Sequence, residues 1–232
     1  MRPLLLSFLT LGCCFVAEAA PQAISQTSPN SLDWDHAFAD HSGTRPLHFT
    51  ARYTDARGPH TLEVWRTGHT HLRRRTDDRI DLHADAQNPQ QANQPDYLWQ
   101  IIDLPHHIDN RISSHGLLQA GLLYNFYAMA HVLTRPAGHF QIELAPASPT
   151  ASPTHLPCTW YKLTPEAQPA TRICWSPTLG IPIATQSVSK DGTLTDTFTL
   201  LTYDHNAIPS STFAVNLKGL TVRDHDALAS DD

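Results

Sequence analysis

The segment LHFTARYTDARGPHTLEVWRTGHTHLRRRTDDRIDLHA, residues 47–84, contains four short runs of strand-forming residues. Over 47–53, apolar and polar residues alternate strictly, which is the period of a strand with one buried face. Three further runs, at 61–66, 70–75 and 79–84, are separated by tight turns. Strands spaced about ten residues apart with such turns predict an antiparallel meander.

The rest of the chain predicts one long helix and a second set of strands. Residues 113–138 carry apolar side chains at spacings of three and four, with Ser113 or Ser114 as the N-cap and Pro136 and Gly138 at the end. Because sheet and helix must each bury an apolar surface, we expect an α+β fold with this helix packed on one face of a curved antiparallel sheet. The further expected strands are 97–103, 139–145, 158–164, 171–176, 181–189 and 193–203, with an edge strand at 208–215.

The N-terminus has the features of a secretory signal peptide. Arg2 precedes a short apolar stretch at 4–16, and Ala17-Glu18-Ala19 forms a small-x-small cleavage site. We therefore expect residues 1–19 to be removed and the protein to be exported to the periplasm. In the alternative interpretation, Cys13 is the lipidated cysteine of an outer-membrane lipoprotein.

The exported chain is expected to form one main domain. Residues 20–44 predict a polar lead-in and a short helix capped by Ser31, residues 45–216 the sheet domain, and residues 217–232 a polar tail. The net charge of −6 argues against nucleic acid or an anionic membrane surface as the main partner. No stretch after residue 20 is long and apolar enough to span a bilayer.

Cys158 and Cys174 remain after removal of the signal peptide, and in an oxidising compartment they predict a disulfide. If Cys158 faces Cys174, the centre of the hairpin falls at Glu166, inside a loop that favours a turn. Closing this loop is worth about 3 kcal/mol of unfolding free energy on the chain-entropy model. The alternatives are a redox pair, which usually has C-x-x-C spacing, and a metal site.

Candidate catalytic and metal-binding residues form no recognisable motif. The chain has 15 histidines, but they are scattered, and His69 with His71 is a pair that a strand would place on one face. His106-His107 lies in a predicted loop, and the motifs G-x-S-x-G and H-E-x-x-H are absent from the sequence. We expect an exposed polar face, no cofactor, no metal and no enzymatic activity.

Aromatic residues are the more informative group. Trp65, Trp99, Trp160 and Trp175 fall on predicted strands, and Phe126 falls on the predicted helix. These side chains form either an ordinary core between sheet and helix or the lining of an apolar cavity. A strongly curved sheet that carries a single helix also leaves a concave face that one helix need not fill, and apolar ligands bind in such hollows.

The order of strands, helix and strands in an exported chain resembles the LolA/LolB-type half-barrels and the related RseB-type sensor domains. The resemblance lies in LEVWRTGHTHLRRRTD (62–77), in CWSPTLGIPIATQSVSKDG (174–192) and in IPSSTF (208–213). The Gly180-Ile181-Pro182 turn and the Asp191-Gly192 hairpin occupy the places that such motifs have in that family. The resemblance implies an open half-barrel whose apolar cavity holds acyl chains or a similar ligand.

The sequence therefore predicts a non-enzymatic periplasmic half-barrel that binds an acyl chain, a lipid or a lipidated partner. The alternative is a docking protein of an envelope complex, with a filled core and a binding face at Arg73–Arg75. The predicted cavity lining is Trp65, Trp99, Leu122, Phe126, Met129, Trp160 and Trp175.

Overall fold

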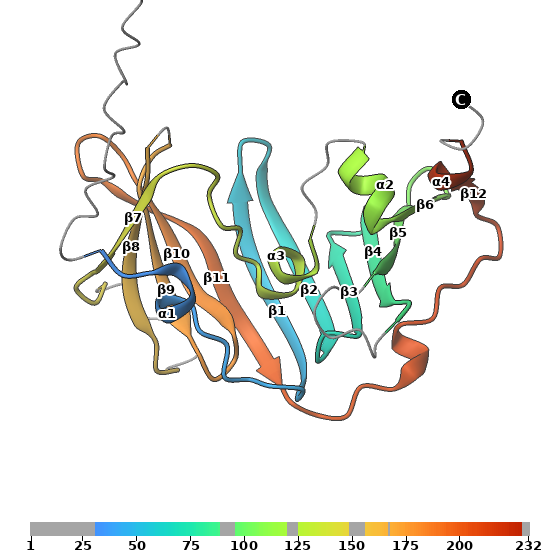
Figure 1. Ribbon diagram of the computed structural model, residues 1–232, viewed down its shortest axis with the longest axis horizontal. Helices are drawn as coiled ribbons and strands as arrows, with labels where there is room; N and C mark the ends of the chain where they lie inside the picture. The colour runs from blue at the N-terminus through green and yellow to red at the C-terminus, as the bar shows by residue number, and fades with distance from the viewer. Residues whose placement is uncertain (1–30, 89–95, 120–124, 149–155, 167, 229–232) are drawn as a thin grey trace, which may run out of the picture.

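The computed structural model describes residues 31–88, 96–119, 125–148, 156–166 and 168–228. Within these residues, twelve strands form one continuous sheet (Figure 1). Its strands are β1 (Pro46–Asp55), β2 (Gly58–Thr67), β3 (His71–Thr76), β4 (Ile80–Ala86), β5 (Tyr97–Asp103), β6 (Ile108–Ser113), β7 (Phe140–Leu144), β8 (Thr159–Pro165), β9 (Thr171–Ser176), β10 (Ile181–Val188), β11 (Leu194–Asp204) and β12 (Thr221–Asp224).

The sheet consists of two antiparallel meanders that meet at β1. The strand order is β12-β6-β5-β4-β3-β2-β1-β11-β10-β9-β8-β7, and β12 pairs with β6 in the parallel direction. Strand β1 pairs with β2 along its whole length and with β11 on its other edge. The meander predicted for residues 47–84 is thus confirmed, and the open sheet agrees with the predicted α+β class.

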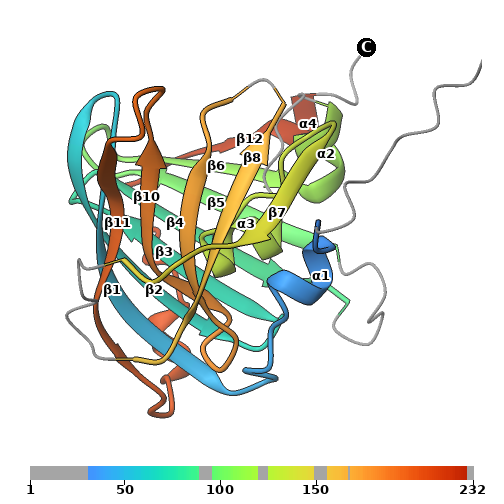
Figure 2. The same ribbon diagram turned by 90° about the vertical axis from the view of Figure 1, so that its left-hand side faces the viewer.

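The sheet is strongly curved, and the helices α1 (Trp34–Ala37) and α3 (Phe126–His131) lie inside the curve (Figure 2). We call this side the concave face and the opposite side the convex face. Along β1, Leu47, Phe49 and Ala51 are buried in a core cluster that includes Phe126 of α3, so these residues face the concave side. The strict alternation of the sequence places His48 and Thr50 on the convex face.

The prediction of one long helix over 113–138 is wrong. The structure has two short helices there, α2 (Ser114–Gln119) and α3. Asn125 has an extended backbone (φ −129°, ψ 154°), and its side chain accepts a hydrogen bond from the Ala128 amide at 2.7 Å, so it begins a new helix. Leu118, which the apolar spacing placed on the buried face, is 69% exposed. Asparagine favours a cap over a helix interior, and this preference overrides the apolar spacing.

The first helix also begins later than predicted. The N-cap of α1 is Asp33, whose side chain accepts a hydrogen bond from the His36 amide at 2.8 Å, and the cap is therefore not Ser31. Ser113 does cap α2, because its hydroxyl accepts a hydrogen bond from the Gly116 amide at 3.0 Å. No helix in the described part of the chain is long and apolar enough to cross a membrane.

The structure joins Cys158 to Cys174 by a disulfide, with a Cα–Cα distance of 5.4 Å. The predicted register, with the two cysteines directly opposite, is wrong, because Trp160 is the residue that faces Cys174. The observed register places Tyr161 beside Ile173, so two apolar side chains meet on one face. The disulfide therefore joins a diagonal pair of residues, one of which precedes β8.

Residues 205–220, which we call the strap, connect β11 to β12 and run below the lower ends of the strands in Figure 1. Nη1 of Arg73 donates a hydrogen bond to the Thr212 carbonyl at 3.1 Å. Nδ1 of the buried His83 lies 3.2 Å from the Phe213 carbonyl. The strap thus fastens the end of the second meander to the outside of the first.

The structure differs from the strand predictions at three places, all in polar segments of the chain. β6 is a strand that the sequence did not predict, because its residues, IDNRIS, lack a clear apolar alternation. The edge strand expected at 208–215 is wrong, since a 3₁₀-helix occupies Ser210–Thr212 and Pro209 offers no amide to a ladder. β12 lies in the expected tail at 217–232, where every strand residue is exposed and no apolar pattern marks it.

Candidate functional site

The concave face contains a pocket of about 800 Å³ between α1, α3 and the ends of β2 to β5. We call it the concave pocket. Apolar and aromatic side chains make most of its walls, and polar groups lie among them. Its lining residues are Trp34, Asp35, Thr44, His69, Thr70, Ala86, Tyr97, Asn125, Phe126, Tyr127, Ala128, Leu133 and Arg135.

Helix α3 forms one wall of the concave pocket and packs directly on the sheet. The ring of Phe126 stacks on that of Tyr97 of β5, with 4.6 Å between centroids and an angle of 16° between planes. Both rings are buried. The charged residues Asp35 and Arg135 are exposed, and the Arg135 guanidinium lies 5.6 Å from the Phe140 ring. The pocket therefore has apolar walls and charged groups where it meets solvent.

At the C-terminal end of α3 lies a polar group, formed by the buried Ser42, Arg66 and His131 and the partly buried Asp40, which we call the buried polar cluster. Arg66 of β2 is 2% exposed, and its Nη2 donates hydrogen bonds to the Ser42 hydroxyl at 3.2 Å and to the Leu179 carbonyl. Its Nη1 lies 3.0 Å from Nδ1 and 3.1 Å from Nε2 of His131. Four separate parts of the chain, including α3 and the β9–β10 turn, are thus joined by one side chain.

The hydrogen bonds assign a neutral His131. Its Nδ1 lies against the Gly180 carbonyl, so this nitrogen carries the proton, and Nε2 accepts a hydrogen bond from Arg66. Burial, together with the Arg66 charge, lowers the pKa of His131 to about 4. Burial also lowers the pKa of Arg66. Burial alone would raise the pKa of Asp40, but hydrogen bonds from Ser42 outweigh it and lower the pKa.

Gly180 allows the β9–β10 turn to meet this cluster. Its φ of +62° is in the left-handed region, and a Cβ atom there would lie 2.3 Å from Oδ1 of Asp40. A side chain at position 180 would also come within 3.1 Å of Nη2 of Arg66. Position 180 therefore requires glycine for two reasons: the backbone has a positive φ, and the Asp40 carboxylate leaves no room for a Cβ atom.

The structure brings together only part of the predicted lining. Phe126 lines the concave pocket, while Trp99 and Trp175 are 1% exposed in the core of the concave face. Met129 is partly buried against the same core, where its sulfur lies 3.6 Å from Nη1 of Arg74. Leu122 lies outside the described residues.

Two of the predicted tryptophans lie on the convex face. Trp160 faces Cys174, so it and the adjacent Trp175 point to opposite sides of the sheet. Trp175 is the concave one, because its indole donates a hydrogen bond to the Ala39 carbonyl beside α1 at 2.9 Å. Trp65 stacks against His48 of the convex face, with 5.0 Å between ring centroids.

Several residues of the site were not singled out by the sequence analysis. Trp34 and Tyr97 line the concave pocket, and Arg66 and His131 support it. A signal for Arg66 was present, since it continues the alternation of Leu62 and Val64, both buried. No comparable signal marks His131, because the apolar spacing over 113–138 predicts a continuous helix around it.

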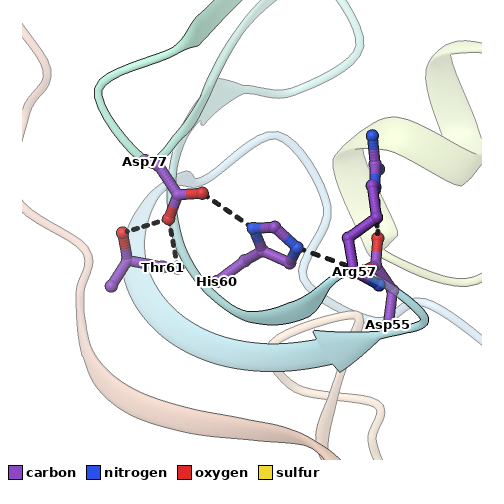
Figure 3. Close-up of polar contacts among 5 residues, drawn as sticks. All are labelled: Asp55, Arg57, His60, Thr61 and Asp77. Atoms are coloured by element: carbon purple, nitrogen blue, oxygen red, sulfur yellow. Dashed lines mark hydrogen bonds and ion pairs between the residues drawn. The ribbon is translucent and has the colours of Figure 1, made fainter.

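A second cluster, around His60, has the residue types of a catalytic site but not its geometry (Figure 3). Nδ1 of His60 lies 2.7 Å from Oδ2 of Asp77, and Nε2 lies 3.1 Å from Oδ1 of Asp55. Both ring nitrogens face carboxylates, so neither is available to accept a proton from a substrate. The cluster connects the β1–β2 hairpin to the β3–β4 turn and acts as a structural contact.

Hydrogen bonding to Asp77, and then to Asp55, raises the pKa of His60. The backbone amide of Arg57 is the first cause that lowers the pKa of Asp55, to about 2, and the hydrogen bond from His60 lowers that of Asp77. The histidine contributes stability below its ordinary pKa of about 6.5, and this is lost as pH rises through the raised value. The carboxylates contribute stability above about pH 4, their ordinary pKa, and this contribution is lost as the pH falls toward 2.

We therefore expect His60→Gln to lower the melting temperature most between about pH 4 and pH 6.5. The difference in melting temperature between the wild type and His60→Gln should shrink above and below this pH window. Thermal unfolding between pH 2.5 and pH 9 measures it, with His115→Gln as the control, because His115 contacts the Gln119 amide. A difference that stays constant with pH would show that His60 carries no charge in this contact.

The three arginines of the predicted docking face do not share a surface. Arg73 pairs with Asp81 across the convex face at 2.6 Å, and Arg75 pairs with Asp78 at 2.7 Å. Arg74, between them in the strand, points to the concave side, where it contacts Met129. The sequence Arg-Arg-Arg is thus divided between the two faces of β3.

Comparisons with known proteins find similarity in structure but not in sequence. No protein-family model matches the chain, and no curated protein matches it. The solved complex of Pseudomonas aeruginosa MucA and MucB is similar at 14% identity and a TM-score of 0.43, covering 79% of this chain and 60% of that chain.

Two further structures give similar values. MucB in complex with MucA(peri) matches at 16% identity and a TM-score of 0.40, covering 77% of this chain and 56% of that chain. MucB alone matches at 12% identity and a TM-score of 0.41, covering 79% of this chain and 62% of that chain. The chain spans less than two thirds of the MucB chains that it matches.

The described residues contain no group of three or more His, Cys, Asp or Glu side chains that could hold a metal ion. His69 and His71, the pair considered for a shared metal face, have different environments. His69 lines the concave pocket, and Nδ1 of His71 lies 2.7 Å from Oδ1 of Asp85.

Proposed function

We propose that this protein binds an apolar ligand, an acyl chain of a lipid or of a lipidated partner, in the concave pocket. The observation that carries the proposal is the pocket itself, about 800 Å³ in volume with walls that include Trp34, Tyr97 and Phe126. A pocket of this size is within the range of small-molecule sites, and aromatic walls favour apolar ligands. The charged residues at its opening suit the polar end of an amphiphile.

We further propose that the protein acts by binding and not by catalysis, and that it does so in the periplasm. The first point rests on the concave pocket, whose walls are mostly apolar and aromatic. The second rests on the signal sequence expected at residues 1–19, which lies outside the described part of the chain.

The alternative is a docking protein for an envelope complex. The docking alternative predicts a concave face filled by side chains and a charged binding surface at Arg73–Arg75. The concave pocket and the division of these arginines between two faces favour the ligand-binding proposal.

Titration with a fluorescent long-chain fatty acid tests the proposal. We expect saturable binding to the wild type and about tenfold weaker binding to Phe126→Ala, since the variant removes one aromatic wall. Trp65→Leu is the matched control, because it removes an aromatic side chain from the convex face. Circular dichroism checks that each variant is folded.

Absence of saturable binding by the wild type, together with no lipid in native mass spectra of gently purified protein, would contradict the proposal. Equal losses in both variants would place the probe outside the concave pocket.

A further inference from the structure

His131 is the last residue of α3, the helix whose first residues form the wall of the concave pocket. Its side chain is 0% exposed. The next residue, Val132, has a left-handed backbone (φ 53°, ψ 34°), so the helix ends at the point where His131 enters the buried polar cluster. The contacts of this ring therefore fix the position of α3 on the sheet.

Charged and titratable groups reach His131 from each element packed around it. Arg66 comes from β2, and Asp40, which follows α1, places Oδ2 3.6 Å from Nε2. Tyr127 of α3 stacks on the imidazole with 4.0 Å between centroids, and the positive form is further disfavoured by His69 from the β2–β3 turn. The Gly180 carbonyl of the β9–β10 turn completes the surroundings.

This arrangement accepts only the neutral ring. In the neutral form, Nδ1 donates to the Gly180 carbonyl and Nε2 accepts from Arg66. In the imidazolium form, Nε2 would carry a hydrogen that faces the N–H donor of Arg66, and two positive charges would share one partly buried carboxylate, that of Asp40. A buried charge without a partner of its own is strongly unfavourable.

We propose that protonation of His131 releases α3 from the sheet and opens the concave pocket, so that ligand exchange is favoured at acidic pH. The inference rests on the proposed function only for the ligand; the movement of α3 is a property of the protein itself. At neutral pH α3 is held against the sheet as one wall of the pocket.

The size of the effect follows from proton linkage. An imidazole in the opened form has the ordinary pKa of about 6.5, whereas the pKa of the buried ring is about 4. Between these values the opened form binds more protons, so opening is favoured as pH falls. The ratio of opened to closed protein should rise roughly 30-fold between pH 7.5 and pH 5.

Amide hydrogen exchange of the full, ligand-free protein tests the movement. We expect protection factors of residues 128–133 to fall roughly 30-fold between pH 7.5 and pH 5, while those of β4 change little. His131→Gln should remove the pH dependence, because its amide can donate to Gly180 and accept from Arg66 without a charge. His106→Gln, which alters an exposed histidine paired with Asp103, should leave the dependence unchanged.

Unchanged protection of 128–133 relative to β4 in the wild type would overturn the inference, even if His131→Gln does not fold. An equal pH dependence in folded His131→Gln would also overturn it. Fatty-acid binding at the two pH values is the second measurement, with weaker or faster-exchanging binding expected at pH 5. If protection changes as expected but no probe binds at either pH, the proposed function fails and the role of His131 stands.

Discussion

Replacing Arg66 with alanine is expected to lower the free energy of unfolding by about 3–5 kcal/mol. The substitution leaves the Leu179 carbonyl, the Ser42 hydroxyl and Nε2 of His131 without the donor that satisfies them. It also leaves the partly buried Asp40 without a neighbouring positive charge. Urea denaturation at pH 7.5 measures the change.

Arg57→Ala is the matched control for this prediction. Arg57 also lies close to an aspartate, with Nη2 3.0 Å from Oδ2 of Asp55, but its side chain is 82% exposed. Exposed ion pairs contribute little, so we expect a much smaller change in the free energy of unfolding than for Arg66→Ala. Similar changes in the two variants would mean that the buried polar cluster does not hold α3 and the β9–β10 turn to the sheet.

Gly180→Ala is expected to lower the free energy of unfolding by about 3 kcal/mol. About 1 kcal/mol comes from placing alanine at positive φ, and the rest from moving Asp40, whose Oδ1 lies 2.3 Å from the new Cβ position. Chemical denaturation of wild type and variant gives the difference.

Gly138→Ala separates these two contributions. Gly138 has a φ of +75°, and nothing lies within 4 Å of an added Cβ, so this variant carries the backbone term alone. We expect it to lose about 1 kcal/mol. If both variants lose the same amount, the approach of Asp40 to the turn makes no contribution to stability.

Alternation of apolar and polar residues was a reliable guide wherever a strand buries one face. It predicted β1 and the strands that follow it, because Leu47, Phe49 and Ala51 are buried together. It did not predict β6, where Ile112 is the one buried apolar side chain, or β12, which is held by backbone pairing and by polar contacts. One such contact joins the Asp226 carboxylate to the backbone amide of Ser113 at 2.7 Å, and this pairing has no period in the sequence.

The candidate site was less predictable than the fold. Composition placed aromatic residues on the strands, but the face that each one occupies depends on register and on bulges. A register irregularity between Pro182 and Ala184 is one example. Trp65 and Trp160 are on the convex face, because Trp65 alternates with the buried Leu62 and Val64 and Trp160 faces Cys174. Trp34, from a four-residue helix, lines the concave pocket. The buried polar cluster joins residues as far apart in the sequence as Arg66 and Leu179, which no local pattern reveals.

The pairing of β1 with β11 has a consequence for how the chain reaches its native state. His48 faces Asp204, a separation of 156 residues, so the central seam of the sheet forms only after almost the whole polypeptide has been synthesised. Contacts of such long range carry a large loop-closure entropy and slow the folding reaction. Until β11 arrives, one edge of β1 presents unpaired backbone groups, and this edge is where an incomplete chain would associate with its neighbours.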